Sequence, residues 1–409
     1  MLTRLHYSEL KPVTPAYWAT LVVLMLIAIA GIASAHHMDV EGHHISGMDN
    51  QIVWGLPHVF AIFLIVAASG SLNLASLSSV FNKVEYKPLA RLSSLVSVAL
   101  LIGGLVILLL DLGRPDRLIV AMTYYNFKSI FAWNIILYTG FVAIVILYLW
   151  MMMERRMARF IAPVGMLALA WRLILTTGTG SIFGFLVARE AYDSALLAPM
   201  FIVMSFSFGL AVFLLLLITA FRFDQRVLDI SHLQRLRKLL GLFTLGVFYF
   251  VILFHLTKLY GANNHGFESF ILLNGGAYTT TFWLGQILLG TAMPLILLFH
   301  GRFRQSVGAL VAASIAVICG ALSQLYVIII GGQAYPLDIF PGYHVESSFS
   351  DGVVSQYSAS IWEIMLGLSG VSIAVLLVLL ILRVLPIAPD LLPPDSPAQQ
   401  DQQDQQDQS

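Results

Sequence analysis

The chain has 409 residues, of which 58% are hydrophobic and only 11% are charged, and its formal net charge is zero. Soluble domains carry about 25% charged residues, so this composition excludes a water-soluble protein and favours an integral membrane protein. The balanced charge gives no indication of nucleic-acid binding. The single cysteine, Cys319, can neither close an internal disulfide nor hold an iron–sulfur cluster, which needs about four protein ligands.

Apolar stretches that are long enough to cross a bilayer recur along nearly the whole sequence. A membrane-spanning helix needs about 20 apolar residues, and these stretches are continuous rather than alternating, which excludes a β-barrel. The predicted fold class is all-α, a polytopic membrane protein whose transmembrane domain covers residues 17–385. In sequence order the ten expected helices are Tyr17–Ala35, Ile52–Val80, Pro88–Leu110, Ser129–Met152, Ile161–Val187, Ser194–Ala220, Lys238–Leu259, Tyr278–His300, Val307–Ile330 and Ser358–Leu385.

The distribution of Lys and Arg between the connecting segments predicts the orientation, because cytoplasmic loops carry an excess of them. One side holds sixteen of these residues: Arg4, Lys11, Lys83, Lys87, Arg91, Arg155, Arg156, Arg159, Arg222, Arg226, Arg235, Arg237, Lys238, Arg302, Arg304 and Arg383. The other side holds five: Arg114, Arg117, Lys128, Arg189 and Lys258. Both termini should therefore be cytoplasmic, namely residues 1–16 and the tail 386–409, whose Pro, Gln and Asp content predicts disorder.

Asp111 opens the run Asp111-Leu112-Gly113-Arg114-Pro115 directly after an apolar helix. The run lies on the outward side, which is the periplasmic side in a bacterium. Ionisable groups at membrane edges cost free energy and are usually kept for a function. A carboxylate there can exchange a proton with a substrate or with water. The alternative is an ion pair at the helix end, with Arg114 or Arg117 as the partner.

His58 follows Trp54-Gly55-Leu56-Pro57, and we expect it about two turns inside the second helix, at a depth similar to that of Asp111. An imidazole can donate a hydrogen bond to a carbonyl, relay a proton or bind a metal. Taken alone, His58 is better explained as a histidine that bonds a neighbouring helix. The matching depth of Asp111 favours a functional pair.

Arg172 lies within the fifth span and precedes a run of small and hydroxylated residues, Thr176-Thr177-Gly178-Thr179-Gly180-Ser181. A charge at this depth is costly unless it is paired or solvated. Small residues are typical of close helix packing, but beside a buried Arg they could also form a polar path. The hypothesis is a proton path that includes Arg172, Thr176 and Thr179.

Two further polar residues are candidates for contacts with a ligand. Asn134 stands in an aromatic region, Tyr124-Tyr125-Asn126-Phe127 and Trp133, that is either an interfacial belt or the wall of a pocket with Asn134 as a donor. Gln333 follows two glycines after the ninth span and either approaches a ligand or caps the helix. The histidine-rich loop His36–Gln51 matches no zinc spacing, so no metal site is predicted.

Asp-Leu-Gly-Arg-Pro at the outer end of a helix, a His-bearing helix before it, and Ile-Ile-Gly-Gly-Gln after a late helix resemble the NrfD/polysulfide-reductase membrane-subunit family. The resemblance covers about residues 15–385 and is strongest to the ten-helix branch, which includes HybB-like and DsrP-like subunits. It implies two four-helix bundles, here the second to fifth and the sixth to ninth spans, with flanking helices.

The resemblance also implies a function. Such a subunit holds no covalently bound cofactor and takes menaquinone or ubiquinone as an exchangeable substrate near the outer surface, close to His58, Asp111, Arg114, Asn134 and Gln333. Its implied partners are a periplasmic ferredoxin-like iron–sulfur subunit, a multihaem cytochrome c and further subunits of a Dsr-type complex. The protein would serve an oxidoreductase complex in the bacterial inner membrane, with His58 and Asp111 as catalytic residues, because quinone chemistry moves two protons with two electrons.

Two other functions stay open on the sequence. One is a haem b-binding membrane cytochrome, in which His58 and His255 would be the axial ligands. The other is a secondary transporter, which would have helices broken near the bilayer midplane, and only the Thr-Gly-Ser run of the fifth span suggests such a break.

The predicted orientation can be tested with reporter fusions. A fusion after Arg159 should give a cytoplasmic signal and one after Tyr357 a periplasmic signal. The reason is that Arg159 lies on the side that holds sixteen Lys and Arg residues, and Tyr357 lies on the side that holds five. The reverse pattern would overturn the orientation and an outward position for Asp111.

Overall fold

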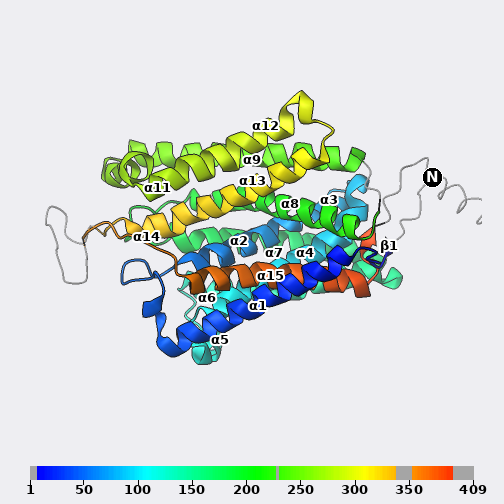
Figure 1. Cartoon of the computed structure of the whole chain (residues 1–409), viewed down its shortest axis with the longest axis horizontal. Helices are drawn as coiled ribbons and strands as arrows, with labels where there is room; N and C mark the ends of the chain where they lie inside the picture. Colours follow the sequence, from blue (N-terminus) through cyan, green and yellow to red (C-terminus); the bar gives the residue numbers. More distant parts are fainter. Residues whose placement is uncertain (1–6, 227–229, 338–351, 390–409) are drawn as a thin grey trace, which may run out of the picture.

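The computed structural model describes residues 7–226, 230–337 and 352–389. In this part of the sequence, ten helices are long and apolar enough to cross a membrane, which confirms the predicted number and fold class (Figure 1). Their main helical elements are α1 (Pro15–Glu41), α2 (Leu56–Ser71), α3 (Asn73–Ser79), α4 (Ala90–Leu110), α6 (Ile130–Met153), α7 (Ile161–Gly184), α8 (Leu197–Phe223), α9 (Ile230–Tyr260), α11 (Ala277–Thr280), α12 (Met293–Phe299), α13 (Val307–Tyr326) and α15 (Ile361–Val384).

Short elements complete the described residues. They are β1 (Tyr7–Ser8), α5 (Leu118–Thr123), α10 (His265–Ser269), α14 (Gly332–Ala334) and β2 (Ala388–Pro389), together with the 3-10 turns His43–Ile45, Val84–Leu89, Pro115–Arg117, Arg155–Phe160, Ala262–Asn264 and Gly301–Phe303. Phe270–Asn274, Thr281–Ala292 and Val327–Gly331 are π-helical. All three π-helical segments lie in the second half of the sequence, and such turns are frequent at functional sites.

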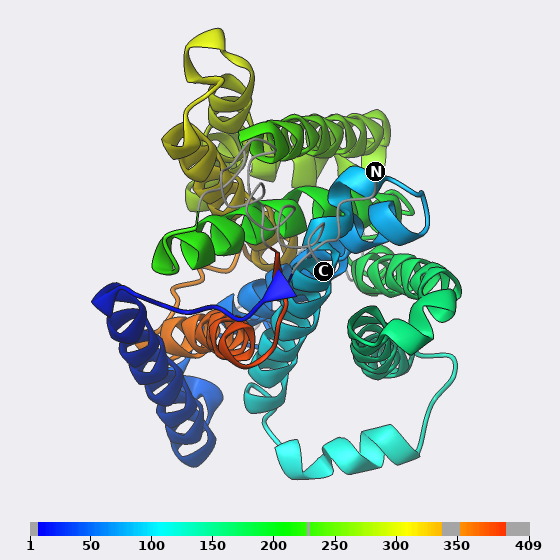
Figure 2. The same ribbon diagram turned by 90° about the vertical axis from the view of Figure 1, so that its right-hand side faces the viewer.

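The long helices form two groups that meet at α8. Helices α2, α4, α6 and α7 pack together, and so do α8, α9, α12 with its preceding π-helical segment, and α13. Helix α8 also packs against α2 and α7, which joins the groups, while α1 and α15 lie together against α4 (Figures 1 and 2). The arrangement agrees with the two expected bundles and their flanking helices.

Helix α2 lies at the centre of the molecule. In the span Leu56–Ser79, 94% of the most apolar window is buried, compared with 28% for α1. Small residues allow α8 to approach it: Ser71 Oγ donates to Gly209 O at 3.1 Å, and a side chain at Gly70 would collide with the backbone of Ser205. Close contacts between small residues are a general means of helix association in membranes.

Several predicted helix boundaries are wrong. Helix α1 runs on to Glu41 and includes His36 and His37, which the hydropathy pattern assigns to a loop, and α9 begins at Ile230 rather than Lys238. Hydropathy marks only the apolar part of a helix, whereas the backbone hydrogen bonds continue into polar sequence. The Thr-Gly-Ser run is not a break, because α7 is continuous from Ile161 to Gly184.

The predicted depth of His58 is also wrong. Helix α2 begins at Leu56, with Pro57 in its first turn, so His58 lies in the first turn and not two turns inside. Proline fits the start of a helix because its fixed φ suits that position and its missing N–H needs no partner there. Residues 52–55, which the sequence pattern places in the helix, are irregular.

The first and last described residues lie side by side. Tyr7 and Ser8 pair antiparallel with Pro389 and Ala388, so the start of α1 and the end of α15 lie at one end of the molecule, here called the ribbon end. The opposite end contains the first residues of α2 and the last residues of α4. The Gln/Asp-rich tail that we expect to be disordered lies outside the described residues from position 390 onward.

Candidate functional site

A cavity of about 490 Å³ lies between α2, α4, α6 and α7 at the end of the molecule opposite the ribbon end. Leucines of α4 form one wall, aromatic and polar residues of α6 form another, and Leu118 and Met122 of α5 close it from the side of the α4–α6 connection. Figure 2 shows this connection as an arm beside the bundle. The size and the apolar lining are typical of a pocket for a flat organic molecule.

His58 and Asp111 meet in this cavity. His58 Nδ1 lies 2.9 Å from Asp111 Oδ2, and the Asp111 side chain is only 1% exposed, compared with 23% for His58. The contact is within ion-pair distance but lacks the alignment of a hydrogen bond, and in the described ranges no other group hydrogen-bonds to either carboxylate oxygen. Because the two atoms are already this close, a small rotation of the imidazole would align the two groups.

Asp111 lies in a buried position at the end of α4. Burial removes the water that would solvate the carboxylate. Asp111 is also the C-cap of α4, where the partial negative charge of the helix end adds to its own. A histidine and a carboxylate at this distance are the two kinds of group that proton exchange at a cavity wall requires.

Arg114 does not lie beside Asp111. Its guanidinium pairs with Asp116 at 3.1 Å, and both side chains are exposed. The alternative that Asp111 is the helix-end partner of Arg114 is therefore not what the structure shows. Arg114 is also not among the residues that line the cavity.

Asn134 lines the cavity, but its amide nitrogen is already used. Asn134 Nδ2 donates to Ile130 O at 2.9 Å and to Gly178 O at 3.3 Å, while its Oδ1 is buried without a partner in the described residues. The atom that is free for a ligand is therefore an acceptor, whereas the sequence analysis predicts a donor. An unpartnered buried acceptor is costly, and a hydroxyl group in the cavity would satisfy it.

Several cavity residues are missing from the sequence prediction. Phe131 and Tyr138 lie on the same face of α6 as Asn134, one turn on either side, and Phe183 of α7 and Trp54 complete the aromatic lining. Helical spacing from Asn134 is the signal that could have found the residues of α6. Trp54 precedes the helix, so periodicity gives no indication of where its ring points.

Gln333 is 1% exposed and does not line the cavity. Its Oε1 accepts from the N–H groups of Val53 and Trp54, and its Nε2 donates to Trp54 O and Ile329 O, at 2.8 to 3.0 Å. The structure therefore places Gln333 behind the cavity, where its side chain hydrogen-bonds the segment that leads into α2.

Arg172, Thr176 and Thr179 lie on one face of α7, directed at α2 and α8. Arg172 is 4% exposed; its Nη1 donates to Ser69 O at 3.2 Å, and its Nε has no partner in the described ranges. Thr176 Oγ1 donates to Ser69 Oγ at 2.6 Å. Thr179 Oγ1 donates to Leu175 O at 3.0 Å, and its side chain lies beside the Tyr138 hydroxyl of the cavity wall, so this row of polar side chains begins at the cavity and continues inward.

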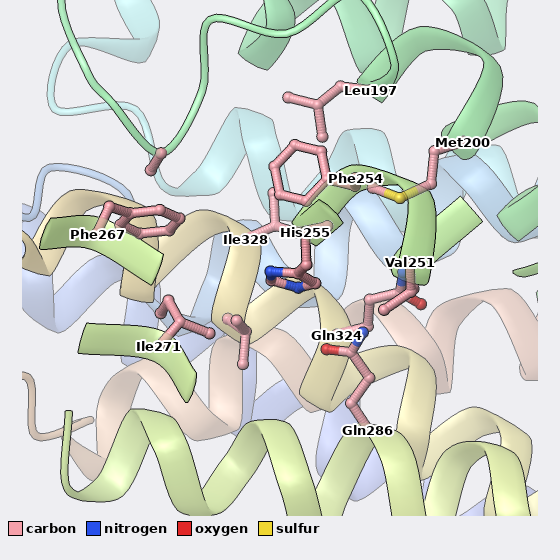
Figure 3. A pocket seen from close by; sticks show the side chains of 12 residues that line it. Leu197, Met200, Val251, Phe254, His255, Phe267, Ile271, Gln286, Gln324 and Ile328 are labelled. Carbon is pink, nitrogen blue, oxygen red and sulfur yellow. The ribbon is translucent and has the colours of Figure 1, made fainter. Parts of the chain in front are cut away.

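The second group of helices contains another histidine–carboxylate pair, His255 Nδ1 and Glu268 Oε2 at 2.8 Å; Figure 3 shows the surroundings of His255. The adjoining cavity measures only about 20 Å³, which suits water and not a flat ring. Gln286 Oε1 and Gln324 Nε2 on its wall are buried without partners among the described residues. The surroundings of His255 therefore do not fit the haem that the cytochrome alternative requires.

A buried carboxylate fixes the connection that precedes α2. Glu363 accepts from the N–H groups of Gly47 and Ser360 at 2.8 Å and from Tyr357 Oη at 2.6 Å. Tyr357 Oη in turn accepts from the N–H of Leu56, the first residue of α2. Burial, and then the Glu363 carboxylate, raises the pKa of the Tyr357 hydroxyl. The hydroxyl therefore keeps its proton and links Glu363 to the first residue of α2.

Comparison with known proteins identifies relatives along most of the sequence. The family model described as "Polysulphide reductase, NrfD" matches residues 44–336. A protein of Archaeoglobus fulgidus named "Hdr-like menaquinol oxidoreductase integral membrane subunit" is 29% identical over 363 residues, which span 88% of this protein and 90% of the relative.

Two further relatives support the same family. A selenate reductase subunit of Mesobacillus selenatarsenatis is 25% identical over 86% of this protein and 90% of its own length. "Protein NrfD" of Escherichia coli is 24% identical over 69% of this protein and 95% of its own length. None of these matches tests the expected likeness to the DsrP-like branch, which stays a prediction.

Proposed function

This chain belongs to the polysulphide reductase NrfD family of membrane subunits, and on that premise we propose that it exchanges electrons between the membrane quinone pool and an iron–sulfur partner. One observation carries the proposal. A histidine and a carboxylate meet 2.9 Å apart at the wall of an apolar cavity that is large enough for a quinone ring. One relative is named as a menaquinol oxidoreductase subunit, which supports a quinone as the substrate, and we propose menaquinone or ubiquinone.

The chemistry of quinol requires such a pair. Oxidation of a quinol to a quinone releases two electrons and two protons, and a group at the cavity must accept each proton as it leaves. His58 can take the first proton from a quinol hydroxyl and pass it to Asp111, which frees the imidazole to take the second; Asp111 also holds the imidazole in place. In the reverse direction the same pair returns protons to the quinone. Asn134 Oδ1 is a further acceptor for a hydroxyl of the ligand.

The proposal has the electrons pass to another protein, because the single cysteine of the sequence cannot hold an iron–sulfur cluster. We propose a ferredoxin-like iron–sulfur subunit docked at the cavity end, with a multihaem cytochrome c and further Dsr-type subunits as the rest of the complex. Arg114, exposed on the rim, reaches the quinone only if it leaves Asp116.

The orientation belongs to the same proposal. The excess of Lys and Arg predicts that the ribbon end is cytoplasmic, so the cavity end faces the periplasm of a bacterial inner membrane. Protons released at His58 and Asp111 then leave on the outer side. The row of Thr179, Thr176 and Arg172 is the proposed path by which protons move between the cytoplasm and the cavity.

The central prediction concerns the pair itself. Asp111→Asn keeps the shape but cannot accept a proton, and His58→Ala removes the imidazole. Each should lower the rate of quinol-dependent electron transfer by at least about a hundredfold, the usual contribution of a general base. The double variant should be little worse than either single variant, because groups that act as a unit are not additive. The rate is measured in membranes that contain the assembled complex.

Two controls accompany this experiment. Glu41→Gln removes an exposed carboxylate at the end of α1, and His300→Ala removes a histidine at the ribbon end; both should leave the rate unchanged. Normal quinol turnover in a fully assembled Asp111→Asn complex would show that the site is wrongly assigned.

The proton route gives a separate prediction. Thr176→Val preserves volume but removes the hydroxyl that bonds Ser69, and Arg172→Leu removes the charge. In proteoliposomes each should reduce proton movement more than electron transfer. Equal losses of both, accompanied by a fall in protein abundance, would mean that these residues only hold α7 against α2.

A further inference from the structure

Side-chain hydrogen bonds hold both ends of the segment from Asp49 to Trp54, directly before α2. Asp49 Oδ1 accepts from the N–H groups of Gln51 and Ile52 at 2.8 and 2.6 Å. Partial burial acts to raise the pKa of Asp49, but the hydrogen bonds from Ile52, Ser355 and Gln51 outweigh it and the pKa is lowered. Asp49 therefore remains an acceptor and fixes the start of the segment.

Gln333 fixes the end of the segment. Its side-chain oxygen accepts from two consecutive N–H groups, those of Val53 and Trp54, and its nitrogen donates to Trp54 O. The nitrogen's second bond, to Ile329 O, anchors the side chain to its own helix. Both polar atoms of the amide are therefore fully used on the backbone, and neither is left for a ligand.

The surroundings of Gln333 come from the second half of the sequence and from the connection before α8. Arg189 donates to Gln333 O and to Gln51 O, both at 2.9 Å. It is thus a second link between the backbone at Gln333 and the segment before α2. Tyr192 packs directly beside Gly332, where a side chain would collide with its ring, and Tyr192 Oη donates to Ile329 O at 2.9 Å. Gly332 is thus required for the close approach that sets Gln333 in place.

The side chain that this arrangement directs into the cavity is Trp54. Its indole lies 6.2 Å from the His58 ring, with an angle of 29° between the planes, and meets Phe183 edge-on at 5.8 Å. Phe131 contacts it at 6.0 Å. Three rings thus hold the indole, which also lines the 490 Å³ cavity beside His58.

We infer that Trp54 is the residue against which the quinone ring packs, and that Gln333 is a positioning residue that holds Trp54 in place and does not contact the quinone. The inference rests on the proposed function. A flat ring next to His58 meets the indole, and aromatic pairs prefer such offset or edge-on contacts. Because this contact is present before and during electron transfer, its loss should weaken binding more than it slows the chemistry.

The test measures KM and kcat for a soluble quinol analogue in membranes that contain the assembled complex. Trp54→Leu should raise KM about tenfold, which is the loss of binding expected when one aromatic contact is removed. It should change kcat less than about threefold. Trp54→Phe, which keeps a smaller ring, should raise KM about threefold. Gln333→Leu should raise KM about tenfold as well, because it frees the backbone that directs Trp54.

The double variant separates positioning from direct contact. If Gln333 acts through Trp54, the Trp54→Leu/Gln333→Leu complex should be no worse than Trp54→Leu alone. A KM raised about a hundredfold, the product of the two single effects, would overturn the positioning role. So would an unchanged KM for Gln333→Leu, and an unchanged KM for Trp54→Leu would overturn the contact.

A second variant guards against a failure of Gln333→Leu to assemble. Gln333→Glu still accepts from the N–H groups of Val53 and Trp54 but cannot donate to Trp54 O, so its KM should lie between those of the wild type and Trp54→Leu. A KM equal to that of the wild type would count against the inference. Trp150→Leu and Gln305→Leu, at exposed positions near the ribbon end, are the matched controls with unchanged KM.

The outcome also distinguishes this inference from the proposed function. Loss of turnover in Asp111→Asn with normal KM in the Trp54 and Gln333 variants contradicts the inference alone. Normal turnover in Asp111→Asn contradicts the proposed function, whatever the other variants do.

Discussion

Asp111 is a carboxylate buried at the end of a helix, with the His58 imidazole as its counter-group in the described part of the sequence. Burial removes water from the carboxylate, and the His58 ring, 2.9 Å away, is the polar group placed beside it. The surrounding structure maintains this situation. Leucines of α4 and residues of α5 give the cavity its apolar lining, and the first turn of α2 is held in place so that the imidazole reaches the carboxylate.

The two halves of the molecule have different roles at this site. The first group of helices encloses the cavity, whereas Gln333 and Arg189, which lie outside that group, hold the segment that enters α2. The second half has its own pair, His255 and Glu268, but the space beside it is only about 20 Å³. A histidine–carboxylate pair alone therefore does not make a site for a large ligand. The apolar cavity beside His58 is what distinguishes the first pair from the second.

Sequence reasoning predicted the ten helices and their grouping well, because burial in a bilayer demands about 20 apolar residues per helix. It also brought His58 and Asp111 together from their similar positions along two helices, although the depth of His58 was wrong. It misjudged Arg114 and the free atom of Asn134, since which partner a side chain finds depends on neighbours that are distant in sequence. Trp54 and the role of Gln333 could not be predicted, because their contacts join positions 279 and 280 residues apart.

The proposed quinone occupies the cavity beside His58 and Asp111. Photolabelling of the intact complex with an azido-quinone, followed by peptide mass spectrometry, tests this position most directly. The label should appear on residues of α4 and α6 that line the cavity, such as Leu108 and Ile135, and excess quinol should suppress it. Suppressible label confined to the second group of helices, or to a partner subunit, would contradict the account.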